Sequence, residues 1–118
     1  MSTVLIVDDV TEIHELIRSA LEPTGVTSLH ATSLDEALQL YDEHQPKLVV
    51  ADVRIQPESG YDLLAKLQAR NPEARVVLMS GYKGLDERRE ALEAGALDYW
   101  EKPFALKAFV ERIRQLVA

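Results

Sequence analysis

The most constraining feature of this sequence is a regular alternation of short, β-branched apolar segments with longer amphipathic segments. The first apolar segment, Thr3–Val7, suits a strand buried on both faces, and two aspartates close it. The spacing that follows predicts an amphipathic helix, which Pro23, Thr24 and Gly25 end. The apolar stripe of this helix consists of Ile13, Leu16, Ile17, Ala20 and Leu21.

The same strand and helix pattern then recurs along the chain. Further apolar strands are expected at 26–31, 48–51, 76–79 and 97–101. One expected helix starts at a capping-box pattern of Ser33 with Glu36, and two others start near Tyr61 and near Asp86. The last expected helix has an apolar side formed by Phe109, Val110, Ile113, Leu116 and Val117. Alternating strands and helices require parallel pairing with right-handed crossovers. The sequence therefore predicts an α/β fold with a doubly wound, five-stranded parallel sheet and helices on both faces.

Length and charge narrow the function classes. A chain of 118 residues suits one domain, residues 1–118. With 20 acidic and 13 basic residues, the formal charge of −7 argues against a nucleic-acid partner, because phosphate binding needs clustered Lys and Arg. No cysteine is present, so disulfides and thiolate sites are excluded, and no apolar run approaches a membrane span. We therefore expect a cytoplasmic protein with no membrane partner.

Polar side chains stand where the predicted strands end. Asp8 and Asp9 follow the first strand, Asp52 the third, Ser80 the fourth and Lys102 the fifth. Ligands of open α/β sheets bind beyond the carboxyl ends of the strands, so we expect these residues in one crevice. Three carboxylates and one ammonium make that crevice favourable for a cation, and oxygen ligands without His or Cys suit Mg²⁺.

Over its whole length the chain resembles a response regulator receiver domain of two-component signal transduction, the CheY-like family. The resemblance rests on VLIVDD at 4–9, VVADVR at 49–54, VVLMSGY at 76–82 and GALDYWEKPF at 95–104. It implies the flavodoxin-like strand order 2-1-3-4-5, of which a member of this family is a standard example. It also implies a phosphoacceptor that takes its phosphoryl group from the phosphohistidine of a histidine kinase or phosphotransfer protein.

Residue by residue, the resemblance makes Asp52 the phosphoacceptor. It makes Asp8, Asp9, Asp52 and the backbone carbonyl of Arg54 the ligands of Mg²⁺. Lys102 and the Ser80 hydroxyl match the family's phosphate partners. Phosphoryl transfer consists mostly of positioning and charge neutralisation, which is the physical reason for a metal and a cation beside the nucleophile.

The resemblance further implies a switch and its partners. Tyr99 matches an aromatic residue whose ring moves inward when Ser80 is drawn toward the phosphate, and Pro103 matches a cis proline. The output surface is the face of the fourth helix, fifth strand and fifth helix, where a downstream effector binds. A phosphorylation-dependent dimer is left open. The chain is thus expected to catalyse its own phosphorylation and slow dephosphorylation, and not to turn over other substrates.

The sequence departs from the family pattern near the site. Gln56 stands where relatives have proline, with Pro57 one residue later, so the loop after Asp52 is expected to take a different turn. Val10 replaces a common Glu. Arg54 and Tyr82 occupy the two positions that govern water access, and two bulky residues there predict slow hydrolysis of the phosphorylated form.

Other functions fit the residues less well. A haloacid-dehalogenase-type phosphatase needs a second Asp two residues after the nucleophile, where this chain has Arg54. A receiver-like module that binds proteins without phosphorylation would be expected to lack one of the five site residues. The histidines, His14, His30 and His44, share no metal-like spacing and are assigned no role. The sequence does not decide between a stand-alone regulator and a receiver from a longer regulator or hybrid kinase.

Overall fold

The computed structural model describes residues 2–82, 84–103 and 105–118. In chain order its elements are β1 (Thr3–Val7), α1 (Thr11–Leu21), a short 3-10 helix (Glu22–Thr24), β2 (Thr27–Ala31), α2 (Leu34–His44), β3 (Leu48–Asp52), β4 (Arg54–Ile55), β5 (Glu58–Ser59), α3 (Gly60–Arg70), β6 (Val76–Ser80), α4 (Leu85–Glu93), β7 (Asp98–Glu101) and α5 (Leu106–Val117). Five of these strands form the main sheet, and β4 pairs with β5 in a separate hairpin.

The main sheet is parallel throughout, with the order β2-β1-β3-β6-β7. This is the order 2-1-3-4-5 of the five predicted strands, so the predicted fold class and strand order are confirmed. The register pairs Val7 of β1 with Ala51 of β3, which brings the carboxyl ends of these two strands side by side. The order reverses between β1 and β3, the place where ligands bind in open α/β sheets.

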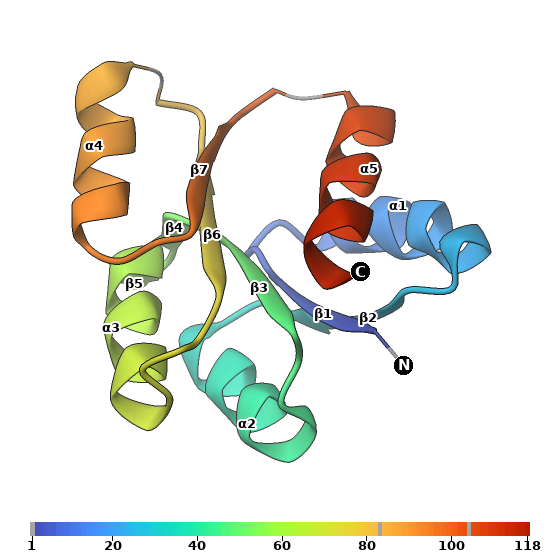
Figure 1. Ribbon diagram of the computed structural model, residues 1–118, viewed down its shortest axis with the longest axis horizontal. Helices are drawn as coiled ribbons and strands as arrows, with labels where there is room; N and C mark the ends of the chain where they lie inside the picture. The colour runs from blue at the N-terminus through green and yellow to red at the C-terminus, as the bar shows by residue number, and fades with distance from the viewer. Residues whose placement is uncertain (1, 83, 104) are drawn as a thin grey trace.

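Helices cover both faces of the sheet (Figure 1), with α1 and α5 on one face and α2, α3 and α4 on the other. The α1 and α5 face encloses a core that includes Ile6, Trp100 and Ile113, and the opposite core includes Leu5, Leu64 and Tyr99. The central strands β3 and β6 are buried along their whole length. Their continuous apolar runs are the sequence signature of strands covered on both faces.

The inward face of α1 agrees with the predicted stripe except at Leu16. Leu16 is 60% exposed, and the buried residues of this helix are His14, Ile17 and Leu21. Ile17 and Leu21 belong to the predicted stripe, and Ile13 and Ala20 of that stripe pack partly buried against the same core. The prediction for Leu16 was wrong because an imidazole that finds hydrogen-bond partners can replace a leucine in the interior.

The segment after Asp52 forms a hairpin and not a simple loop. Arg54–Ile55 pairs antiparallel with Glu58–Ser59, and the Gln56–Pro57 peptide bond in the turn is cis. The chain then enters α3 through a capping box, in which Ser59 and Asp62 each accept a backbone N–H of the other. The different turn expected at Gln56 and Pro57 is thus a two-stranded hairpin beside the end of β3.

Gly60 sits where the hairpin returns to β3. Its N–H donates to the carbonyl of Val53 at 2.7 Å, and a Cβ at this position would lie 2.5 Å from the carbonyl oxygen of Asp52. Only glycine permits this approach, because backbone atoms on the far side have no room to move. Gly60 therefore sets the distance between the start of α3 and the backbone of Asp52.

In the part of the chain that the structure describes, no helix has the length and apolar character needed to cross a membrane.

Replacing Gly60 with alanine should lower the free energy of unfolding by about 1–3 kcal/mol, the usual cost of forcing a methyl group into occupied space. Urea denaturation monitored by circular dichroism measures this difference. Gly81→Ala is the matched control, since a Cβ at Gly81 meets nothing within 4 Å. Equal stability of the Gly60→Ala variant and the parent would show that a methyl group at position 60 does not clash with the Asp52 carbonyl.

Candidate functional site

The predicted polar residues do stand at the carboxyl ends of the strands. Asp8 comes directly after β1, Asp52 and Ser80 are the last residues of β3 and β6, and Lys102 comes directly after β7. The backbone N–H of Lys102 donates to the Ser80 carbonyl at 2.7 Å, which anchors the lysine beside the end of β6. These residues therefore line one edge of the sheet.

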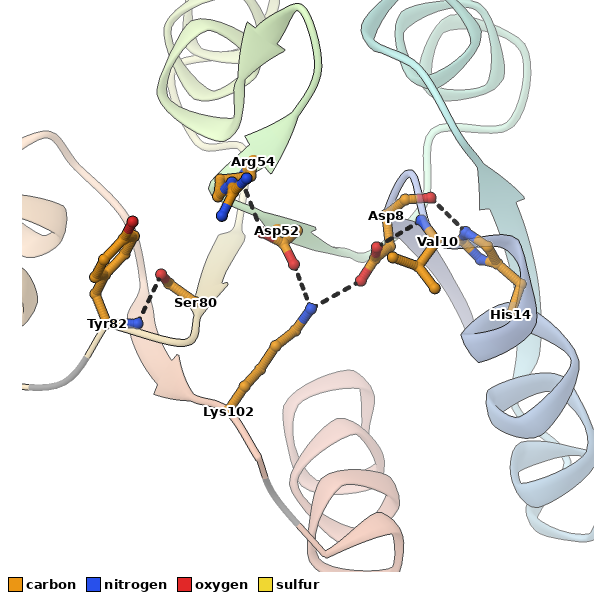
Figure 2. A network of polar contacts seen from close by, with 8 residues as sticks. All are labelled: Asp8, Val10, His14, Asp52, Arg54, Ser80, Tyr82 and Lys102. Carbon is orange, nitrogen blue, oxygen red and sulfur yellow. Dashed lines mark hydrogen bonds and ion pairs between the residues drawn. The ribbon is translucent and has the colours of Figure 1, made fainter.

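Lys102 joins two buried carboxylates, as Figure 2 shows. Its ammonium lies 3.0 Å from Oδ2 of Asp8 and also donates to Oδ2 of Asp52. The Asp8 side chain is fully buried and that of Asp52 is 11% exposed. Two carboxylates in such a place are stable only with a positive partner and hydrogen bonds to their remaining oxygens.

Backbone groups satisfy the other oxygens of the two carboxylates. Oδ1 of Asp8 accepts the N–H of Val10 at 2.9 Å, and Oδ1 of Asp52 accepts the N–H of Arg54 at 2.8 Å. In both cases the donor lies two residues after the aspartate, the spacing of an Asx turn. The turns that end β1 and β3 thus orient the two carboxyl groups.

The charge state of Lys102 follows from its surroundings. Burial alone lowers the pKa of its ammonium, but hydrogen bonds and attraction from Asp52 and Asp8 outweigh burial and raise the pKa above the ordinary value of 10.5. The ammonium therefore stays charged at neutral pH. The stability it contributes is present below pH 10.5 and is lost only as the pH rises through the raised value.

The third predicted carboxylate is placed differently. Asp9 is exposed. Within residues 2–82, 84–103 and 105–118, no three or more His, Cys, Asp or Glu side chains gather in a way that could hold a metal ion. The ligand atoms of Asp8 and Asp52 are nevertheless of the type that a hard divalent cation prefers. Both side chains offer only oxygen, and each carboxylate oxygen has a second lone pair.

Ser80 and Tyr99 both form hydrogen bonds with Tyr82, at the start of the β6–α4 connection. The Ser80 residue is 3% exposed, and its hydroxyl accepts the N–H of Tyr82 at 3.1 Å. The ring of Tyr99 lies inside the protein, 1% exposed, and its hydroxyl donates to the carbonyl of Tyr82. Tyr82 is therefore held through both backbone groups, while the residue itself is 61% exposed.

The carboxylate of Asp98, at the start of β7, connects α4 to the buried Trp100 of the same strand. Asp98 accepts from Arg88 of α4 at 2.8 Å and from the indole N–H of Trp100 at 3.0 Å. The guanidinium of Arg112 in α5 also lies over the indole, 5.6 Å from the ring centre. The side chains of α4, β7 and α5 are thus linked to one another across this face.

Two further predicted residues lie close by. Arg54 follows Asp52 by two residues and its side chain is exposed. The Lys102–Pro103 peptide bond is cis, as the resemblance implied for Pro103.

The sequence analysis assigned no role to His14, which contacts a site residue, or to His30, which contacts His14. Buried His14 of α1 lies 2.8 Å from the backbone carbonyl oxygen of Asp8 (Figure 2), and its second nitrogen lies 2.7 Å from His30 of β2. A signal was present in the sequence, because His14 is spaced i, i+3 and i+7 with Ile17 and Leu21. His44 is exposed at the end of α2.

Comparisons with known proteins agree with this arrangement. The family model described as the response regulator receiver domain matches residues 4–114. "Probable transcriptional regulatory protein TcrX" of Mycobacterium tuberculosis is 35% identical over 98% of this chain and 49% of that protein. "Response regulator protein PilR" of Pseudomonas aeruginosa is 36% identical over 97% of this chain and 25% of that protein. The chain therefore spans about half of one relative and a quarter of the other.

Among solved structures, the receiver domain of the Francisella response regulator 1452 superposes with a TM-score of 0.91 at 27% identity. The superposition covers 99% of this chain and 97% of that one.

Truncating Lys102 should destabilise the protein, because it leaves two buried carboxylates without their shared cation. We expect Lys102→Ala to lower the free energy of unfolding at pH 7 by about 1–3 kcal/mol, less than for a fully buried pair because the lysine is partly exposed. Urea denaturation provides the measurement.

Adding Asp52→Asn to Lys102→Ala should restore part of this loss, since one of the two charges is then removed. The control is Lys107→Ala, an exposed lysine of α5, which should change stability by less than about 0.5 kcal/mol. A Lys102→Ala protein as stable as the parent would show that the ammonium does not compensate the carboxylates.

Proposed function

The chain belongs to the response regulator receiver domain family, and from this premise we propose that Asp52 accepts a phosphoryl group from the phosphohistidine of a histidine kinase or phosphotransfer protein. Residues 1–118 act as one receiver domain in the cytoplasm. The protein is a switch that modifies itself and not an enzyme that turns over another substrate.

The observation that carries this proposal is the ion pairing of Lys102 with both Asp8 and Asp52. A carboxylate can attack an anionic phosphoryl group only where the repulsion between them is neutralised. The Lys102 ammonium already lies against the nucleophile, and it can turn from the Asp52 carboxylate to an oxygen of the incoming phosphoryl group. A flexible four-carbon stem allows this exchange of partners.

The proposed metal is Mg²⁺, held by Asp8, Asp9, Asp52 and the backbone carbonyl of Arg54. When bound, it supplies positive charge that stabilises the phosphoryl oxygens as bonds form and break. For this set of ligands the Asp9 side chain has to turn toward Asp8, which an exposed residue at the start of the β1–α1 connection can do. The role of Asp8 is to hold the cation beside the nucleophile, because its side chain is fully buried and already directed at Asp52 through Lys102.

Besides the phosphohistidine and Asp52, the reaction needs only one proton, which water supplies. An oxygen of Asp52 forms a bond to phosphorus while the bond from phosphorus to the donor imidazole nitrogen breaks. The bonding electrons remain with the imidazole, which takes a proton from water. Lys102 then stays against the phosphoryl oxygens and keeps the new acyl phosphate in place.

Ser80 is the proposed link to the output surface. Its buried hydroxyl accepts from Tyr82 at present, and it would leave that partner to donate to a phosphoryl oxygen on Asp52. Tyr82 is also bonded to the hydroxyl of Tyr99, so such a movement changes the packing between the β6–α4 connection and β7. The face of α4, β7 and α5 then differs between the two states, and a downstream effector domain or protein binds one of them.

Phosphorylation at Asp52 is tested by incubating the protein with Mg²⁺ and acetyl phosphate and measuring the intact mass. The parent should gain one phosphoryl group, and Asp52→Asn should gain none because an amide is not a nucleophile here. Asp35→Asn, an exposed aspartate in the first turn of α2, is the matched control and should behave like the parent. An equal mass gain in Asp52→Asn, or a gain that persists when Mg²⁺ is chelated, would refute the proposal.

Arg54 and Tyr82 should lengthen the life of the phosphorylated form, because exposed bulky side chains two residues beyond Asp52 and Ser80 hinder the approach of water. We expect Arg54→Ala and Tyr82→Ala each to shorten the half-life at least about threefold, or about 0.6 kcal/mol in the hydrolysis barrier. The half-life is measured from intact mass after the phosphoryl donor is removed. Leu85→Ala, an exposed residue at the start of α4, is the control. A half-life of seconds in the parent would contradict the slow hydrolysis.

A further inference from the structure

A row of three side chains runs from the edge strand β2 to the backbone of Asp8. Ser28 Oγ lies 2.8 Å from Nε2 of His30, Nδ1 of His30 lies 2.7 Å from Nδ1 of His14, and Nε2 of His14 lies 2.8 Å from the Asp8 carbonyl oxygen. The two rings meet edge to face with their planes at 89°. His14 is buried, 6% exposed, and His30 and Ser28 are partly buried.

The fold brings these residues together through strand register. His30 of β2 stands opposite Ile6 of β1, so its side chain lies on the sheet face that α1 covers. Ser28 precedes it by two residues and lies on the same face. From α1, His14 reaches this face beside Ile17 and Leu21.

With His14 neutral, the position of each hydrogen in the row follows from the Asp8 carbonyl. A carbonyl oxygen can only accept, so Nε2 of His14 carries a hydrogen. In a neutral ring, Nδ1 of His14 is then an acceptor, and the hydrogen between the two Nδ1 atoms belongs to His30. Nε2 of His30 is in turn an acceptor for the Ser28 hydroxyl. The two histidines therefore hold opposite tautomers, Nε2–H in His14 and Nδ1–H in His30.

The neutral state of His30 agrees with its environment. Burial, the neighbouring His14 and the charge of Arg18 lower the pKa of His30 to about 4. A neutral His30 has one ring nitrogen that accepts, and in this arrangement it is Nε2, which faces the Ser28 hydroxyl.

The row acts on the backbone that carries the Asp8 carboxylate. The Asp8 N–H donates to the Ala31 carbonyl at 3.1 Å, and the Asp8 carbonyl accepts from His14. With both backbone groups held, the Cα–Cβ bond of Asp8 keeps its direction, and the carboxylate lies against Lys102 and the N–H of Val10. We propose that His14 is a positioning residue for Asp8, and that His30 and Ser28 fix the tautomer in which His14 does this.

This inference rests on the proposed function only in taking Asp8 as a ligand of Mg²⁺. His14 touches neither the metal nor the phosphoryl group, so its effect is on the orientation of a ligand. Residues that orient metal ligands in this way typically change metal affinity about 10- to 100-fold when removed.

The tautomers are tested first, by imidazole ¹⁵N NMR of the parent protein at neutral pH without Mg²⁺. We expect the Nε2–H form of His14, the Nδ1–H form of His30, and a scalar coupling between the two Nδ1 nuclei across their hydrogen bond. His44, exposed on α2, should show a mixture of forms. An Nδ1–H form of His14 would overturn the inference whatever the phosphorylation assays give.

The positioning role is tested by titrating MgCl₂ alone and following amide chemical shifts. In His14→Leu the half-saturating Mg²⁺ concentration should rise about tenfold. His14→Gln, whose amide N–H can still donate to the Asp8 carbonyl, should recover most of the affinity, and His44→Leu should match the parent. At saturating Mg²⁺ the rate of phosphoryl gain from acetyl phosphate should stay within about threefold of the parent, because the chemistry at Asp52 is unchanged.

The outcomes separate the two proposals. A parent protein that gains no phosphoryl group refutes the proposed function. A parent that is phosphorylated while His14→Leu keeps the parent's Mg²⁺ affinity refutes the positioning role alone. If His14→Leu does not fold, His30→Leu at the partly exposed end of the row replaces it, with an expected rise of about threefold, below the range for direct removal of the orienting group.

Discussion

Two buried carboxylates that face one ammonium are the interaction on which this structure depends. Asp8 and Asp52 stand beside each other because β1 and β3 are neighbours in register, and their charges would be unfavourable at such depth without a cation. Lys102 reaches them from the end of β7, two strands away from β3 in the sheet. The strand order is thus what allows one lysine to serve both aspartates, and the two hydrophobic layers keep the three groups in place.

The same arrangement leaves the site ready to change. Lys102 and Ser80 are both engaged with partners that they can exchange, a carboxylate in one case and a backbone N–H in the other. Tyr99 is already inside the protein and tied to the loop that Ser80 holds. The charge that the proposed phosphorylation adds at Asp52 would act on groups whose hydrogen bonds are local. Rearranging them costs little compared with moving a strand or helix.

Much of this could be predicted from the sequence, and the limits have physical causes. Strand order, both layers and the placing of Asp8, Asp52, Ser80 and Lys102 at one edge follow from alternating patterns and from motifs that the family shares. The β4–β5 hairpin was not predicted, because strands of two residues are too short to show a periodic sequence pattern. Asp9 was expected in the site from its place at the strand end and from the acidic pair of the family, and its exposure could not be predicted, because successive residues at a strand end point in different directions.

The buried position of His14 was not predicted for a different reason. A histidine on an apolar helix face has no defined role until its partner is known, and its partner, His30, comes from a strand whose register is not visible in the sequence. Leu16 was placed inside in its stead, because hydrophobicity alone favours leucine over histidine for burial. Only the three-dimensional pairing shows that the interior position holds a polar ring with both nitrogens engaged.

The surroundings of Trp100 have a practical consequence. This is the only tryptophan of the chain, and its indole contacts both a carboxylate held by Arg88 of α4 and a guanidinium of α5. Indole emission shifts with the electric field across the ring, so its wavelength depends on the position of α4 relative to α5. The protein therefore contains its own optical probe, and that probe reports on the face of α4, β7 and α5 and not directly on Asp52.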